Sequence, residues 1–151
     1  MRAKILEILY EWSKIPYQKW FKKNHPWEIT TSQLLQYPKD TLGFHLGRFI
    51  QQHGFSPQPR LENHDVFHVL TNTGITVPEE ISMQYLLLGN GKRSLYLAMV
   101  IGIGTLLYPD KLNVFIDAFH KGKQAFSFYQ LDYQKLLNQP LNKIRTTFLI
   151  Q

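Results

Sequence analysis

Apolar residues recur at intervals of three and four through most of this 151-residue chain, and the alternation typical of a β-strand is scarce. Proline and glycine separate the periodic stretches, because both residues oppose the continuation of a helix. The stretches cover residues 3–13, the segment between Pro16 and Pro26, and residues 38–53, 61–71, 76–88, 93–108, 109–125 and a short piece after 140. This pattern predicts an all-α fold, a compact bundle of about seven helices that forms one domain over residues 1–151.

Two of the expected helices carry signals at their ends. Pro38 lies near the first turn of the stretch 38–53, and Gly54 lies just past its last residue, as is common at helix termini. Thr76 and Glu79 have the spacing of a capping box, in which the two side chains bind each other's backbone amides. A helix is therefore predicted to begin at each of these places.

The stretch 93–108 is the most apolar part of the chain, and its 14 residues from Leu95 to Tyr108 carry no charge. A helix needs roughly 20 apolar residues to span a bilayer, so we expect a buried central helix here. Gly102 and Gly104 would permit close approach of a neighbour. The two prolines within residues 56–60 predict a loop.

The segment His64-Asp65-Val66-Phe67-His68 places two histidines four residues apart on an expected helix. Their imidazoles then project from the same face, one turn apart, and can hold one divalent ion. Asp65 can reach the same ion or orient an imidazole. The four-residue spacing alone also fits ordinary core or surface histidines. Two histidines alone bind a metal ion weakly, so a metal site here needs a further ligand from elsewhere in the chain.

Glu79 and Glu80 open the next expected helix, and a helix–turn–helix connection would bring them back towards the histidines. Glu79 is three residues past Thr76 and therefore fits the capping role. Glu80 projects about 100° further round the helix, so it is predicted to be the free ligand. Because the chain has no cysteine, the metal must be held by nitrogen and oxygen atoms.

Three other kinds of site have partial counterparts in the sequence. His45 or His53 with Asp117 could complete an HD-type metal phosphohydrolase site, but their spacing is not diagnostic. A zincin would have glutamate where Asp65 stands. The segment 89–94 (Gly-Asn-Gly-Lys-Arg-Ser) lacks the spacing of a phosphate-binding loop and is interpreted as an interhelical turn. The histidines without acidic neighbours at ligand spacing are interpreted as structural: His25, His45, His53 and His120.

The chain carries 17 Lys and Arg against 11 Asp and Glu, a net charge of +6, which favours anionic partners. The basic residues are scattered, so we interpret them mainly as a solvated surface, with attraction to a membrane or to phosphate as the alternative. A nucleic-acid-binding module is disfavoured because no basic cluster or motif is present. The first seven residues lack the apolar core of a signal peptide, and the missing cysteines fit a reducing compartment, so we expect a cytoplasmic protein.

The pattern His64-Asp65-x-x-His68, followed after eleven residues by Glu80, resembles the hallmark of the coenzyme Q (ubiquinone) biosynthesis protein 4 family. Residues 41–49, 118–123, 131–133 and 140–145 resemble its upstream and closing segments, so the likeness covers about residues 38–148. Glu79 stands where the family often has glycine, and Tyr133 where it often has tryptophan.

This resemblance implies a compact bacterial member with an all-helical, often dimeric fold. It implies a divalent metal, zinc or a similar ion, held by His64, Asp65, His68 and Glu80. The expected ligand is a polyprenyl lipid or quinone precursor, and the expected partners are a second copy of the chain, other quinone-biosynthesis proteins and the inner face of the cell membrane. The expected activity is oxidative decarboxylation of the polyprenylated ring at C1. A non-catalytic scaffold that binds the same lipid remains open.

Overall fold

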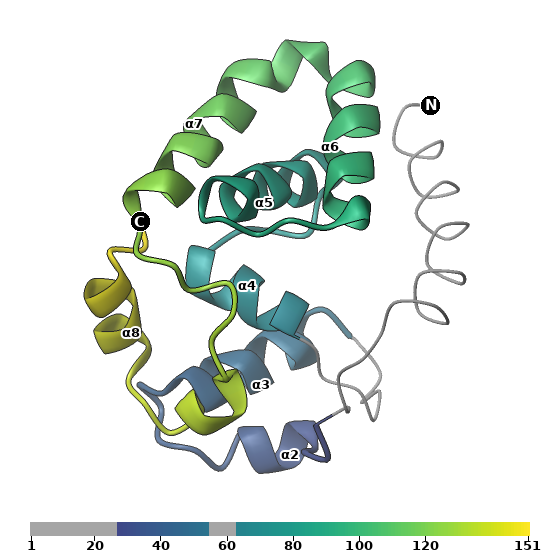
Figure 1. Ribbon diagram of the computed structural model, residues 1–151. Helices are drawn as coiled ribbons and strands as arrows, with labels where there is room; N and C mark the ends of the chain where they lie inside the picture. Colours follow the sequence, from purple (N-terminus) through teal and green to yellow (C-terminus); the bar gives the residue numbers. More distant parts are fainter. Residues whose placement is uncertain (1–26, 55–62) are drawn as a thin grey trace.

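The computed structural model describes residues 27–54 and 63–151, and this part of the chain is all-helical, as the sequence predicts (Figure 1). Its seven α-helices are α2 (Thr31–Leu34), α3 (Leu42–Gln52), α4 (Asn63–Thr71), α5 (Val77–Gly89), α6 (Leu95–Leu107), α7 (Leu112–Gln124) and α8 (Leu141–Phe148). Two short 3₁₀ turns, Pro109–Lys111 and Tyr133–Leu136, complete the order. The helices expected at residues 3–13 and before Pro26, and the loop expected at 56–60, lie outside the described residues.

The start of α3 differs from the sequence prediction. The helix begins at Leu42, four residues after Pro38, because Thr41 is its N-cap and accepts a hydrogen bond from the Phe44 amide at 3.4 Å. Gly54 follows the helix with a φ of +61°, as expected for the residue that ends it. The short helix α2 was not predicted; Thr30 and Gln33 form its capping box.

The segment before α8 holds the start of α3. Thr41 and Pro140 form an isolated antiparallel bridge, the Leu42 amide donates to the Gln139 carbonyl at 2.9 Å, and the Leu141 amide donates to the Asp40 carbonyl at 2.8 Å. Residues about 100 positions apart are thereby fixed side by side, and α3 and α8 become neighbours (Figure 1).

Helices α5 and α7 pack unusually closely through glycine. A Cβ atom at Gly122 would lie 1.9 Å from the Leu86 carbonyl oxygen, and one at Gly89 would lie 2.0 Å from the Phe119 carbonyl oxygen. Asn90, 6% exposed, ends α5 and donates from Nδ2 to the Gly122 carbonyl at 3.1 Å. The segment 89–94 is therefore an interhelical turn, as interpreted from the sequence.

Helix α6 has the predicted position but is not the buried central helix that its composition suggested. Only Leu97 and Gly104 are buried, whereas Leu95 and Leu106 are 75% and 82% exposed. The reason is that α6 packs through one narrow stripe: Gly104 admits Ile81 of α5, with only 2.7 Å between the Ile81 side chain and an added Cβ. Ile101 is partly buried against the core, whereas Leu95, Met99 and Leu106 face outward.

Among the described helices, none is by itself long and apolar enough to cross a bilayer. The pair formed by Leu95–Leu107 and Pro109–Gln124 reaches the required length and composition only when joined, across a bend of 102°.

Candidate metal centre

Three of the predicted ligands meet at the junction of α4 and α5. His64 and His68 lie one turn apart on α4, and Glu80 lies in the first turn of α5 after the connecting turn. One ligand atom from each side chain lies within 4.8 Å of the other two. Within residues 27–54 and 63–151, these three side chains form the cluster that could hold a metal ion. The helix–turn–helix connection expected from the sequence produces the contact.

The distances between the ligand atoms suit a small divalent ion. The Nε2 atoms of His64 and His68 are 3.2 Å apart, and Glu80 places its carboxylate oxygens 3.4 Å from His64 Nε2 and 2.9 Å from His68 Nε2. Ligands about 2.05 Å from a tetrahedral zinc ion are separated by about 3.3 Å. Nitrogen and carboxylate donors are also the types that zinc accepts in a chain without cysteine.

His68 is oriented for ligation by the turn that follows α4. Its Nδ1 lies 3.1 Å from the Thr73 carbonyl oxygen, so Nδ1 carries a proton and donates. In the neutral form of His68, the Nε2 lone pair then faces His64 and Glu80. Phe49 of α3 stacks on the imidazole, with ring centroids 5.3 Å apart and planes at 18°. Both contacts restrict rotation of the ring.

The centre is closed on one side and open on the other. The His68 side chain is 2% exposed, whereas those of His64 and Glu80 are 31% and 32% exposed. A bound ion would therefore be fixed from the protein side by His68 and remain reachable past His64 and Glu80. Catalytic metal sites need such an accessible position, and closed structural sites lack it.

Charge interactions within the cluster stabilise the ionised carboxylate. Burial of Glu80 opposes ionisation, but hydrogen bonds from His64 and His68, together with the histidine charges, lower its pKa to about 2. Burial of His68 disfavours its charged form, but the hydrogen bond and negative charge of Glu80 outweigh burial and raise its pKa. The carboxylate is thus ready to bind a cation, while protons compete with the metal for His68.

Asp65 is not a member of the three-residue cluster. Burial raises the pKa of its carboxyl, and the charges of His64, His68 and Glu80 also act on it, so Asp65 lies within electrostatic reach of the centre. Its role as a ligand remains a prediction.

Glu79 and Glu80 take different positions, as the sequence predicts. The Glu79 carboxylate accepts a hydrogen bond from the Thr76 backbone amide at 3.0 Å and so caps α5. Glu80, one residue further, turns to the histidines.

The HD-type alternative gains no support. His45 and His53 line a hollow beside α3, whereas Asp117 lines another hollow at α7, and none of the three joins the ligand cluster of the described residues.

Two features of the region were missed by sequence reasoning. The Thr73 carbonyl that orients His68 is a backbone group, which no residue pattern reveals. Arg145 donates from Nε and Nη2 to the carbonyls of Leu70 and Val69 at 3.0 and 2.7 Å, and so binds the end of the ligand helix α4.

Comparison with known proteins places the chain in a family. Residues 22–151 match the family described as Coenzyme Q (ubiquinone) biosynthesis protein Coq4. The chain belongs to the Coq4 family. The resemblance stated from the His-Asp-x-x-His and Glu80 spacing is thereby confirmed. No curated protein matches the chain.

A solved structure shows the same fold as this Coq4-family chain. It is a crystal structure of a protein from Nostoc punctiforme PCC 73102 that is named as a ubiquinone biosynthesis protein. The TM-score is 0.69 at 18% sequence identity, and the match covers 100% of this chain and 82% of the Nostoc chain. At that identity, the likeness supports the fold alone.

Proposed function

We propose that this Coq4-family protein serves ubiquinone biosynthesis by binding a divalent metal, zinc, and a polyprenyl ring precursor, and that it supports oxidative decarboxylation of the ring at C1. The observation that carries the proposal is the convergence of His64, His68 and Glu80 at ligand distances from one another. Asp65 completes the proposed set, as a fourth ligand or as an orienting carboxylate. The family match supports the pathway.

The residues of the centre suit a reaction that removes a carboxylate. When bound, the ion supplies a Lewis acid to a carboxylate or phenolate oxygen of the ring. The partly exposed edge at His64 and Glu80 admits the ring, and the contact with Thr73 keeps His68 fixed while it enters. The bond between C1 and the carboxylate breaks, CO2 departs and its bonding electrons remain on C1. The hydroxyl that replaces it comes from water as C1 is oxidised by two electrons and dioxygen is reduced to hydrogen peroxide. The carboxylic acid, dioxygen and water thus give the ring hydroxyl, CO2 and hydrogen peroxide, and the two electrons pass to dioxygen because zinc exchanges none.

The apolar surface of α6 offers a path for the polyprenyl tail. Ile81, the neighbour of Glu80, packs against Gly104, so α6 and the metal centre share the start of α5. Leu95, Met99 and Leu106 are exposed along α6. A tail that covers them removes apolar area from water, at about 25 cal/mol per Å².

A non-catalytic scaffold is the second candidate, and the amount of exposed apolar surface favours it. Val114 and Ile116 of α7 are 55% and 40% exposed, in addition to the residues of α6. A surface of this kind can bind lipid or other biosynthetic proteins without any reaction.

Metal analysis tests the centre directly. Purified protein should contain close to one equivalent of metal by mass spectrometry, and His64→Ala and Glu80→Ala should each lose most of it. His120→Ala is the matched control, because this histidine is exposed on α7 outside the cluster. Unchanged metal content in both ligand variants would show that the centre is wrongly assigned.

Turnover separates the enzyme from the scaffold. The protein is incubated aerobically with a prenylated 4-hydroxybenzoate labelled at the carboxyl carbon, and released CO2 is counted. The enzyme hypothesis predicts release that depends on His64 and Glu80. Release that survives their loss contradicts it, whereas lipid binding without release supports the scaffold.

The remaining expectations from the resemblance are part of the proposal. We propose a homodimer that lies on the inner face of the cell membrane and contacts other quinone-biosynthesis proteins. Analytical ultracentrifugation measures the oligomeric state, and flotation with anionic vesicles measures membrane binding. A monomer would contradict the homodimer, and protein that does not float with the vesicles would contradict the membrane association.

A further inference from the structure

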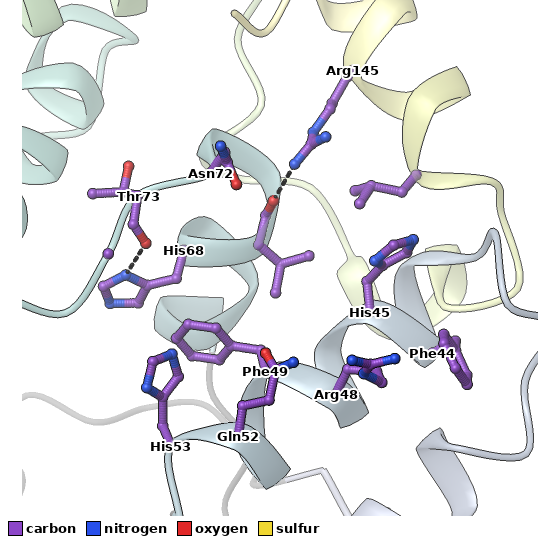
Figure 2. Close-up of a pocket in the computed structure, with 13 residues that line it drawn as sticks. Phe44, His45, Arg48, Phe49, Gln52, His53, His68, Asn72, Thr73 and Arg145 are labelled. Carbon is purple, nitrogen blue, oxygen red and sulfur yellow. Dashed lines mark hydrogen bonds between the residues drawn. The ribbon is translucent and has the colours of Figure 1, made fainter.

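A second hollow lies beside the metal centre, between α3, the end of α4 and α8. It has a volume of about 540 Å³ and opens to solvent. Figure 2 shows its lining, with His45 and Arg48 from α3 on one side and Arg145 from α8 above them. Of the three metal ligands, only His68 reaches its wall, so the hollow is separate from the open edge at His64 and Glu80.

The lining is cationic and contains no acidic residue. Its positive charge comes from two guanidinium groups, Arg48 and Arg145, and three histidines also line it: His45, His53 and His68. Among the described residues, Arg48 has no hydrogen-bond or ion-pair partner. Guanidinium groups form paired hydrogen bonds with carboxylate and phosphate oxygens.

The electrostatic effect of these arginines reaches across the hollow. The pKa of His45 is lowered by partial burial of the ring first, then by the positive charges of Arg145 and Arg48. Asp40 acts in the opposite direction without cancelling them. The positive potential is thus left without a compensating carboxylate in the wall.

One of the two guanidinium groups is already fixed in place. Arg145 donates from Nε and Nη2 to the carbonyls of Leu70 and Val69, and its remaining N–H groups stay available to a ligand. A donor held in this way loses little conformational freedom when an anion binds.

The hollow also has an apolar side. Phe44 and Phe49 line it together with the arginines (Figure 2). Leu141 of α8 also contributes to the lining. Its volume lies in the range of small-molecule sites, about 300–1,000 Å³, and exceeds what a bare phosphate needs. Its chemistry therefore suits an oxyanion attached to an apolar group.

We propose that this hollow is an anion-binding site, in which Arg48 and Arg145 hold the carboxylate or phosphate of a small amphiphilic molecule while the aromatic wall contacts its apolar part. The two arginines that would hold the anion are not metal ligands, so the site does not need the metal ion. Anion binding at this hollow can therefore be tested independently of the proposed metal chemistry.

Titration of the metal-stripped full chain tests the site. Phenyl phosphate and benzoate are the probes, benzyl alcohol is the neutral analogue, and binding is measured by calorimetry at low and high salt. One or both anions should bind, with affinity that falls as salt rises, and benzyl alcohol should bind at least tenfold more weakly. The tighter anion identifies whether a phosphate or a carboxylate is the natural head group.

Variants locate the binding. Arg48→Gln should weaken the anion by about tenfold, the loss expected for a charge-assisted hydrogen bond. Arg93→Gln removes the same charge from the turn before α6, outside the hollow, and should leave affinity unchanged. His64→Ala should also leave it unchanged.

Three results would overturn the proposal. These are equal binding of benzyl alcohol and the anions, equal losses in Arg48→Gln and Arg93→Gln, and loss of binding in His64→Ala, which would move the anion to the metal centre.

Discussion

Replacement of Gly122 by alanine should destabilise the protein, because α5 and α7 touch through their backbones at this position. An added Cβ would lie 1.9 Å from the Leu86 carbonyl oxygen and 3.0 Å from the Asn90 amide nitrogen. Real Cβ atoms essentially never approach other atoms below 3.0 Å, so the helices would have to separate by about 1.1 Å. Backbone atoms cannot rotate away as a side chain can.

The expected cost follows from three contributions. Overpacking costs about 1–3 kcal/mol, with this contact at the upper end because both sides are backbone. Separation also weakens the hydrogen bond from Asn90 Nδ2 to the Gly122 carbonyl, worth about 1 kcal/mol. Alanine regains about 1 kcal/mol of helix propensity over glycine. The net loss is about 2–3 kcal/mol, or roughly 5–10 °C in Tm for a domain of this size.

Gly102→Ala on α6 is the matched control. This glycine is exposed, and an added Cβ meets no described atom within 4 Å. The same substitution should there stabilise the protein by about 0.5–1 kcal/mol. Urea unfolding followed by far-UV circular dichroism measures both. Equal effects at the two glycines, or a neutral Gly122→Ala, would refute the close packing of α5 on α7.

Three further changes test the core and the helix ends. Tyr133→Phe removes a buried hydroxyl that donates to the Phe128 carbonyl at 2.5 Å, and should cost about 1 kcal/mol at pH 8. Burial raises the pKa of Tyr133 above its usual value of 10.0, so the contribution of the neutral hydroxyl to stability is complete below pH 10 and is lost above it. Between pH 10 and 11.5, Tm should therefore fall less in Tyr133→Phe than in the unmodified protein. An identical fall in both proteins would contradict this account. Asn90→Ala leaves two amides and three carbonyls of the backbone without this partner, and should cost about 3 kcal/mol in urea unfolding. A loss below about 1 kcal/mol would indicate that water replaces the Asn90 side chain. Thr41→Ala removes the hydrogen-bond acceptor of the Phe44 amide and should lower the free energy of unfolding by about 1 kcal/mol. An unchanged free energy of unfolding would show that this cap does not stabilise α3.

Local signals in the sequence predicted most of the described helices and the grouping of His64, His68 and Glu80. The capping box at Thr76 and Glu79 left Glu80 as the free carboxylate, and the structure places Glu80 against both histidines. These inferences succeeded because cap and ligand geometry depend on a few neighbouring residues.

Burial could not be predicted in the same way. The composition of α6 favoured a buried position, but a residue is buried only if a partner covers it, and α6 meets α5 along one stripe at Gly104. The start of α3 likewise depends on which side chain accepts a hydrogen bond from the unpaired backbone amides of the first helical turn. Pro38 suggested an earlier start, but Thr41 provides this cap for the Phe44 amide, so the helix begins at Leu42. Tertiary contacts decide both outcomes.

The proposed metal ligands all fall within residues 64–80, a single helix hairpin. The arginines of the hollow, Arg48 and Arg145, come from opposite ends of the described chain and meet only when α8 docks against α3. Contacts close in sequence form early and cost little loop entropy, whereas distant contacts need the whole fold. The three side chains of the proposed metal centre therefore need one local hairpin to come together, whereas the two arginines of the hollow need α3 and α8 both in place.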